Sequence, residues 1–80
     1  MVDVIFDPSF QKEFQKIKDK ILKERIMKQI FKIKENPEIG KPMKYTRRGT
    51  RELYIPPFRL SYSVEGNTVY VLEVYHKDEQ

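Results

Sequence analysis

The sequence predicts a small α+β fold: an N-terminal strand, a helical hairpin, and then an antiparallel β-meander with the helices packed on one face of the sheet. Three observations support this prediction. Apolar residues recur at helical spacing in the first half of the chain and alternate at strand spacing in the second half, and helix-ending residues lie at the change. We expect the 80 residues to form a single domain, because so short a chain is near the lower limit for a stable core.

The N-terminal half is expected to contain one strand and two helices. Residues 2–6 are mostly β-branched or aromatic, and this run stops at Asp7 and Pro8, which suit a helix cap and a first helical position. The helical pattern that follows contains neither Gly nor Pro, so it also permits one long helix. Such a helix would overhang the small sheet. We therefore predict a bend at residues 18–20, where Asp19 can cap a second helix.

The C-terminal half is expected to form three antiparallel strands. Apolar and polar side chains alternate over residues 51–55, 58–64 and 68–77, as they do along strands. Turn residues separate these runs at Pro56-Pro57 and at Gly66-Asn67. The three runs therefore predict a meander with two short connections.

Strict alternation divides this meander into two faces. The face under the helices is expected to carry Leu53, Ile55, Leu60, Tyr62, Val64, Leu72 and Val74. The opposite face is expected to carry Thr50, Glu52, Tyr54, Arg59, Ser61, Ser63, Val71, Glu73, Tyr75 and Lys77. The second face combines charged and aromatic side chains, so any chemistry is expected there.

Positive charge is concentrated in one stretch of the chain. Residues 41–59 hold six cations and one anion, a net charge of +5, whereas the whole chain has +4. The six cations are Lys41, Lys44, Arg47, Arg48, Arg51 and Arg59. A basic stretch beside aromatic strand residues is typical of a surface that binds a phosphate backbone. For Lys41, Lys44, Arg47 and Arg48 the alternative interpretation is an ordinary solvated loop.

The composition excludes several classes of site. The absence of cysteine excludes disulfides, thiolate metal sites and a cysteine nucleophile, and favours a reducing compartment. The single histidine, His76, excludes a centre built from several histidines. The first residues do not resemble a signal peptide, and no run approaches the roughly 20 apolar residues of a membrane span. We therefore expect a cytoplasmic protein with no membrane contact.

The order of these elements, together with three short motifs, resembles the RelE/ParE superfamily of toxin–antitoxin toxins. The motifs are GKPMKY at residues 40–45, FRLSY at residues 58–62, and His76-Lys77 after an apolar strand. The resemblance covers essentially the whole chain. It implies a RelE-like toxin of a type II toxin–antitoxin system, which cleaves messenger RNA on the ribosome by attack of a ribose 2′-hydroxyl on the adjacent phosphate. That chemistry needs no metal or cofactor.

The resemblance also implies roles for individual residues. Arg59 matches the family's phosphate-stabilising arginine, and Lys77 stands in place of a second arginine near the leaving group. In an ungapped comparison, Thr50 and Glu52 replace a pair of lysines found in the RelE branch. Glu52 is then a candidate base, although a carboxylate also repels phosphate. The alternative to a catalytic role for Arg59 is a purely structural one, a cross-strand ion pair with an acidic neighbour such as Glu52.

The family's C-terminal tyrosine has no counterpart here. Tyr75 or Tyr54 can replace it only if its hydroxyl reaches the same pocket. His76 aligns with a histidine of several branches, but alternation points it to the helix side, so a structural role is favoured. The expected catalytic set is Arg59, Lys77, Glu52 and Tyr75. The expected RNA- and phosphate-binding set is Lys41, Lys44, Arg47, Arg48 and Arg51.

The missing lysine pair and tyrosine leave two other hypotheses open. A ParE-like or degenerate toxin would bind a protein target without ribonuclease activity. A plain RNA-binding module would use the same face without chemistry. The resemblance implies as partners the ribosome with its messenger RNA and a cognate, RelB-like antitoxin, which would hold the toxin in a heteromeric complex.

Overall fold

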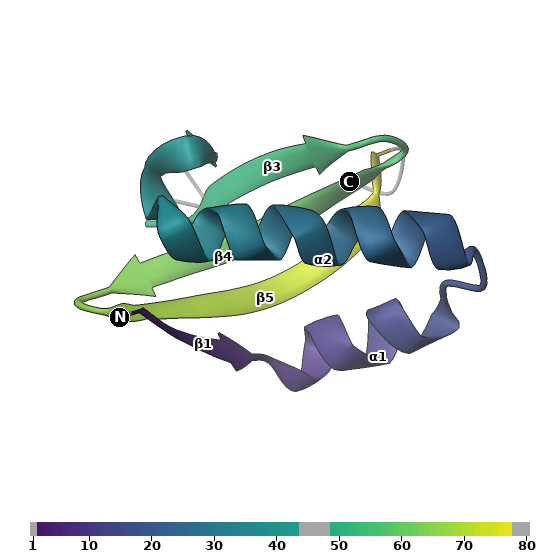
Figure 1. The fold of residues 1–80 in the computed structure, drawn as a ribbon, viewed down its shortest axis with the longest axis horizontal. Coiled ribbons are helices and arrows are strands. Elements are labelled where there is room, and N and C mark those ends of the chain that lie inside the picture. The colour runs from purple at the N-terminus through teal and green to yellow at the C-terminus, as the bar shows by residue number, and fades with distance from the viewer. Residues whose placement is uncertain (1, 44–48, 78–80) are drawn as a thin grey trace.

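A computed structural model describes residues 2–43 and 49–77 of the chain. In chain order the elements are β1 (Asp3–Phe6), α1 (Pro8–Lys16), α2 (Lys20–Glu35), the 3₁₀ helix η1 (Pro37–Ile39), β2 (Lys41–Pro42), β3 (Arg51–Ile55), β4 (Phe58–Glu65) and β5 (Thr68–His76). The strands form one five-stranded sheet in the order β1-β5-β4-β3-β2 (Figure 1). The predicted α+β fold, with its meander of β3, β4 and β5, is confirmed.

The helical region is divided where the capping residues predict. The Asp7 carboxylate accepts a hydrogen bond from the Ser9 N–H at 2.8 Å, and α1 begins at Pro8. The Asp19 carboxylate accepts hydrogen bonds from the N–H groups of Ile21 and Leu22, at 3.0 and 3.2 Å. Both side chains satisfy N–H groups that have no partner within the helix, so each fixes the start of one helix. The prediction of two helices is therefore confirmed.

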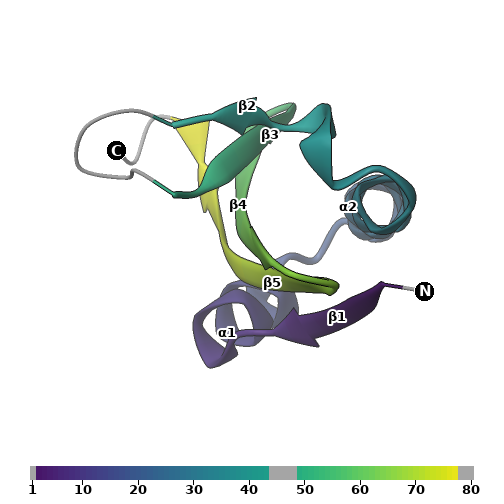
Figure 2. The ribbon, with the colours of Figure 1, turned by 90° about the vertical axis from the view of Figure 1, so that its left-hand side faces the viewer.

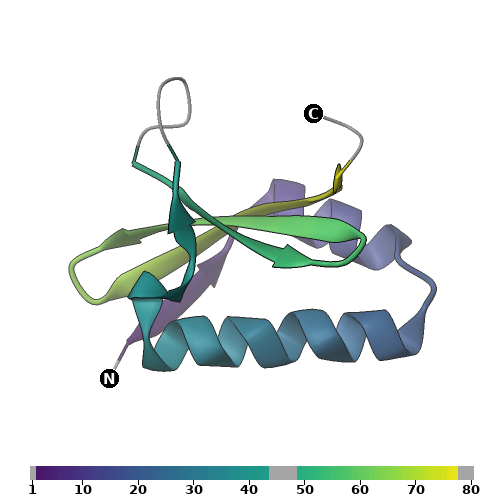
Figure 3. The ribbon, with the colours of Figure 1, turned by 90° about the horizontal axis from the view of Figure 1, so that it is seen from above.

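The sheet curves around α2. Viewed from one end, α2 lies in the hollow of the sheet (Figure 2), and from above it runs along most of the length of β3 and β4 (Figure 3). α1 follows β1 and lies beside β5. β1 pairs with β5 in parallel, while the pairs β2–β3, β3–β4 and β4–β5 are antiparallel. The pattern of residues predicted neither the parallel pairing nor the two-residue strand β2.

Both helices and the sheet contribute to one hydrophobic core. Its buried members are Phe10, Ile17, Leu22, Ile26, Ile30, Ile33, Ile55, Leu60, Tyr62, Val69, Val71 and Val74. Phe6, Phe10 and Phe14 stack in sequence, with ring centroids 5.5 and 5.3 Å apart. These rings connect the end of β1 to α1. In the described part of the chain, no helix is long and apolar enough to cross a membrane.

A β-bulge in β5 corrects one prediction. Ser61 pairs with Glu73, but the next residue, Tyr62, pairs with Val71, so Leu72 is an extra residue on β5. An extra residue reverses the alternation of side chains along the rest of the strand. Val71 is therefore fully buried in the core, whereas strict alternation placed it on the opposite face, and Leu72 is not among the buried core residues.

The Tyr62 hydroxyl fastens the segment between α2 and β2 to the sheet. It accepts a hydrogen bond from the Gly40 N–H at 2.8 Å and donates one to the Pro37 carbonyl at 2.7 Å. Burial raises the pKa of the Tyr62 hydroxyl, although the Gly40 N–H and the charge of Arg51 oppose the shift. A Cβ atom at Gly40 would lie only 2.5 Å from the Tyr62 oxygen. Glycine is therefore required here for close approach.

We predict that Tyr62→Phe lowers the free energy of unfolding by about 1–3 kcal/mol, because it leaves the buried Gly40 N–H and the partly buried Pro37 carbonyl without this partner. Gly40→Ala should cost about as much through overpacking. Urea denaturation of the variants would measure both effects. Tyr70→Phe is the matched control, since Tyr70 is only partly buried. If Tyr62→Phe unfolds at the same urea concentration as Tyr70→Phe, the fastening contributes nothing measurable.

Candidate functional site

Charged and aromatic side chains gather on the face of the sheet that lies away from α2. Residues directly opposite each other on paired strands share a face, so the strand register shows which side chains are neighbours. One row consists of Lys41, Glu52, Ser61 and Glu73, and the next of Tyr54, Arg59 and Tyr75. Val69 and Val71 face the core, so regular alternation along β5 would turn Glu73 and Tyr75 to the core as well. The bulge at Leu72 reverses the alternation and places both on the open face. The two rows form the open face of the sheet.

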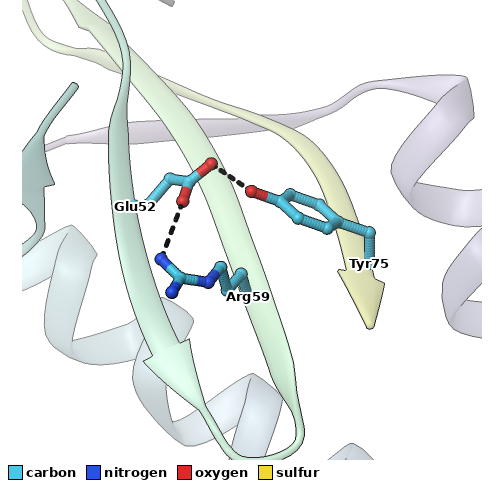
Figure 4. Close-up of polar contacts among 3 residues, drawn as sticks. All are labelled: Glu52, Arg59 and Tyr75. Atoms are coloured by element: carbon cyan, nitrogen blue, oxygen red, sulfur yellow. Dashed lines mark hydrogen bonds and ion pairs between the residues drawn. The ribbon is translucent and has the colours of Figure 1, made fainter. Parts of the chain in front are cut away.

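Glu52 is the centre of this open face. Its side chain is only 3% exposed, and its Oε1 atom lies 3.5 Å from the Arg59 Nη1 atom. The Tyr75 hydroxyl donates a hydrogen bond to Oε2 (Figure 4). A buried carboxylate costs several kcal/mol unless it is paired and hydrogen-bonded. Glu52 therefore ties β3 to β4 through Arg59 and to β5 through Tyr75.

Arg59 retains hydrogen-bonding capacity in this arrangement. Its side chain is 33% exposed, and its single contact with Glu52, at 3.5 Å, is at the outer limit for a hydrogen bond. The Nε atom is buried and has no hydrogen-bond partner among the described residues. A guanidinium has five N–H donors in a planar fork that matches an oxyanion. Arg59 can thus donate to an anion while it remains beside Glu52.

Tyr54 brings a second cation to the same place. The Arg59 Cζ atom lies 5.7 Å from the centroid of the Tyr54 ring, and the Lys77 Nζ atom lies 5.5 Å from it. Both distances are within the range of cation–π attraction. The structure therefore assembles all four predicted catalytic residues, Arg59, Lys77, Glu52 and Tyr75, around three neighbouring strands.

The predicted RNA-binding residues are distributed differently. Lys41 is exposed and is paired with Glu52 in the register, so it borders the open face. Arg51 lies on the other face of β3 and donates to the carbonyls of Gly40 at 2.8 Å and Glu38 at 3.2 Å. It therefore supports the segment before β2. Lys44, Arg47 and Arg48 lie outside the described residues.

The structure also places His76 and the residues that sequence reasoning left out of the site. The His76 ring contacts the Phe58 ring edge-on, at 5.6 Å, on the core side of the sheet, as alternation predicts. Ser61 is buried at 3% exposure between Glu52 and Glu73, and Tyr54 is 52% exposed. The alternation of the sequence places Ser61 and Tyr54 on the open face. It does not show how close either side chain lies to a cation. No metal-binding group of three or more acidic or histidine side chains occurs in the described part of the chain.

This geometry supports anion binding beside an acid–base pair. Arg59 and Lys77 supply positive charge on an accessible surface, while the Tyr75 hydroxyl donates a hydrogen bond to the Glu52 carboxylate. A carboxylate hydrogen-bonded to a phenol can accept a proton that arrives at the phenol oxygen. The arrangement can therefore stabilise negative charge at Arg59 and move a proton through Tyr75.

The fold is similar to the folds of several toxins of known structure. The YoeB/ParE toxin from Agrobacterium tumefaciens has a TM-score of 0.85 and 20% identity, with 94% of this chain and 98% of that chain covered. The toxin–antitoxin complex RelBE of E. coli has a TM-score of 0.81 and 23% identity, with 100% of both chains covered. A heterotetrameric YoeB–YefM complex from Staphylococcus aureus has a TM-score of 0.78 and 25% identity, with 95% and 98% covered.

Sequence comparison identifies the family. Among curated proteins, none matches this sequence significantly. The profile of the family described as "ParE toxin of type II toxin-antitoxin system, parDE" matches residues 4–80. This match covers both helices, strands β2 to β5 and all of β1 except its first residue. The chain therefore belongs to the ParE toxin family of type II toxin–antitoxin systems.

Proposed function

We propose that this toxin is a ribosome-dependent endoribonuclease that arrests translation in the cytoplasm by cutting messenger RNA. The observation that carries the proposal is the contact of one buried carboxylate, Glu52, with both the partly exposed guanidinium of Arg59 and the hydroxyl of Tyr75. Cleavage by a 2′-hydroxyl requires a proton acceptor, a cation for the pentacoordinate phosphorus and a proton donor for the leaving oxygen. The open face offers a residue for each task.

The burial of Glu52 suggests how the proton moves. With 3% of its side chain exposed, Glu52 cannot easily touch a ribose, whereas Tyr75 can connect the two. In the proposed step, Tyr75 passes its proton to Glu52 and takes the proton of the 2′-hydroxyl. The 2′-oxygen then forms a bond to phosphorus as the bond from phosphorus to the 5′-oxygen breaks. Lys77 gives a proton to that 5′-oxygen, and Arg59 stabilises the negative phosphate.

An antitoxin is the proposed partner in the resting state. The RelBE and YoeB–YefM structures are complexes of a toxin with an antitoxin. In this chain an apolar groove of about 410 Å³ lies between the two helices, and its apolar lining is Phe14, Met27 and Phe31. Phe31 is 59% exposed. α2 holds six Lys and Arg residues and two Glu residues, so its surface has a net charge of +4. An acidic amphipathic helix of a RelB-like antitoxin suits this groove.

A second candidate function is inhibition of a protein target without RNA cleavage. It is favoured by the position of Glu52, which offsets the charge of Arg59 where phosphate would bind. It also agrees with the ParE family match, which does not specify a nuclease. The two candidates differ in one observable result: a nuclease breaks messenger RNA, whereas a protein-binding toxin arrests growth with the message intact.

We predict that Arg59→Ala abolishes both growth arrest and breaks in messenger RNA, as mapped by primer extension in induced cells. Loss of one transition-state contact costs about 100-fold or more in rate. The variant also removes a cation that contacts the buried carboxylate of Glu52, so we expect a loss of about 1–3 kcal/mol in the free energy of unfolding.

Because Arg59→Ala is also expected to lower stability, a control must show that its loss of activity is not caused by unfolding. The double variant Arg59→Ala, Glu52→Gln also removes the charge of the buried carboxylate, so it should regain stability in urea while it remains inactive. Glu52→Gln alone should stay folded and cleave at least about 100-fold more slowly. Growth arrest by the wild-type protein without any break in the message would refute the nuclease proposal and favour the second candidate.

We predict that Phe31→Glu prevents neutralisation by the antitoxin, because it places a negative charge in the groove between the helices. Copurification from cells that coexpress the adjacent reading frame would measure retention of the partner. Gln15→Glu is the control, since Gln15 is exposed on α1 and does not line the groove. Equal retention of the partner by both variants would mean that the antitoxin does not use this groove.

A further inference from the structure

The Tyr54 ring is an unusual feature of the open face. It is 52% exposed, although its neighbour on β3, Ile55, is 2% exposed. The Tyr54 hydroxyl has no hydrogen-bond partner among the described residues, so it is the ring that makes the observed contacts. Exposing so much aromatic surface forgoes the gain from burial. A ligand that covers the ring would recover that gain.

Two cations converge on this one ring. Arg59 Cζ and Lys77 Nζ lie 5.7 and 5.5 Å from its centroid. The contact with Glu52 partly offsets the charge of Arg59, but no carboxylate in the described part of the chain pairs with Lys77. Like charges that share one ring repel each other, and an anion between them relieves the repulsion. The site therefore favours a ligand that has a flat π surface and negative charge beside it.

A nucleotide of single-stranded RNA has this chemistry. Its base offers a flat face and its flanking phosphates offer negative charge, and single-stranded nucleic acid is bound by aromatic side chains together with cations. Bases in a duplex are already stacked on each other, so they cannot cover an exposed ring on a sheet. A protein partner could cover the ring but would not bring a phosphate beside it.

We propose that Tyr54 is the stacking platform for a nucleobase of single-stranded RNA, with Arg59 and Lys77 both binding the phosphate beside that base. The proposal rests on the function proposed above, because it takes RNA as the ligand of this face. In the register, Arg59 lies between Tyr54 and Tyr75. A base stacked on Tyr54 would thus hold the RNA strand so that its phosphate lies at Arg59, beside Tyr75. Tyr54 is a positioning residue whose ring acts through the bound RNA.

The test measures binding separately from cleavage. The probe is a short single-stranded RNA with 2′-O-methyl groups, which lacks the attacking hydroxyl and cannot be cut by the proposed step. Tyr54→Leu should weaken its binding by about five- to a hundredfold, the equivalent of about 1–3 kcal/mol. Tyr54→Phe should bind within about twofold of the wild type, because it keeps the ring. Phe31→Leu is the control for removal of an exposed aromatic residue elsewhere, and it should have no effect.

A second probe identifies the contact as stacking. Removal of single bases from the RNA should weaken binding to the wild type at one position, and the same removal should have little further effect on Tyr54→Leu. Equal binding by wild type and Tyr54→Leu, equal losses at every abasic position, or no binding by the wild type would each overturn the proposal. The proposal would also be overturned if Tyr54→Leu lost a copurified protein but kept its binding to RNA. If Tyr54 passes these tests but the message stays intact in cells, the nuclease proposal alone is refuted.

Discussion

The arrangement of the whole molecule depends on the β-bulge at Leu72. Val69 and Val71 belong to the core, whereas Glu73 and Tyr75 belong to the open face. All four are spaced two residues apart along β5. A regular strand would place them on the same side. The extra residue reverses the alternation once, so a single strand can complete the core at its start and the candidate site at its end. Without this reversal, either the core would lose two valines or Glu52 would lose the hydroxyl of Tyr75.

The buried carboxylate of Glu52 favours one register of the strands in the meander, because only that register brings its partners to it. A carboxylate in this position is tolerated because Arg59 comes from one neighbouring strand and Tyr75 from the next but one. A slip of one residue in either strand pair would remove a partner and leave the charge buried. On the opposite face of the sheet, Tyr62 and Arg51 secure the segment from Pro37 to Gly40, which leads into β2. Lys41 follows this segment and thus borders the open face.

The sequence predicts most of the fold because the hydrophobic period changes clearly from helical to alternating. It also predicts the helix break, because Asp19 is a strong cap in a chain too small for one long helix. The bulge escapes prediction, since Leu72 is as apolar as the valines beside it. β2 escapes as well, because two residues that include a proline form a strand only through their pairing with β3. Alternation brings Glu52, Arg59 and Tyr75 to one face, but their contacts, and the two cations at Tyr54, depend on three-dimensional distances. The face on which Arg51 lies also escapes prediction, because a count of cations along the chain does not show where each side chain points.

The central claim is that the open face cuts RNA by attack of a 2′-hydroxyl on the adjacent phosphate. The chemistry of the product ends tests it most directly. Messenger RNA should be recovered from a reconstituted translation reaction that contains the purified toxin, and the ends should be identified by enzymatic end-labelling and mass spectrometry. The account predicts a 2′,3′-cyclic phosphate or its hydrolysis product on one fragment and a free 5′-hydroxyl on the other. Full-length message, or fragments that carry a 5′-phosphate, would contradict it.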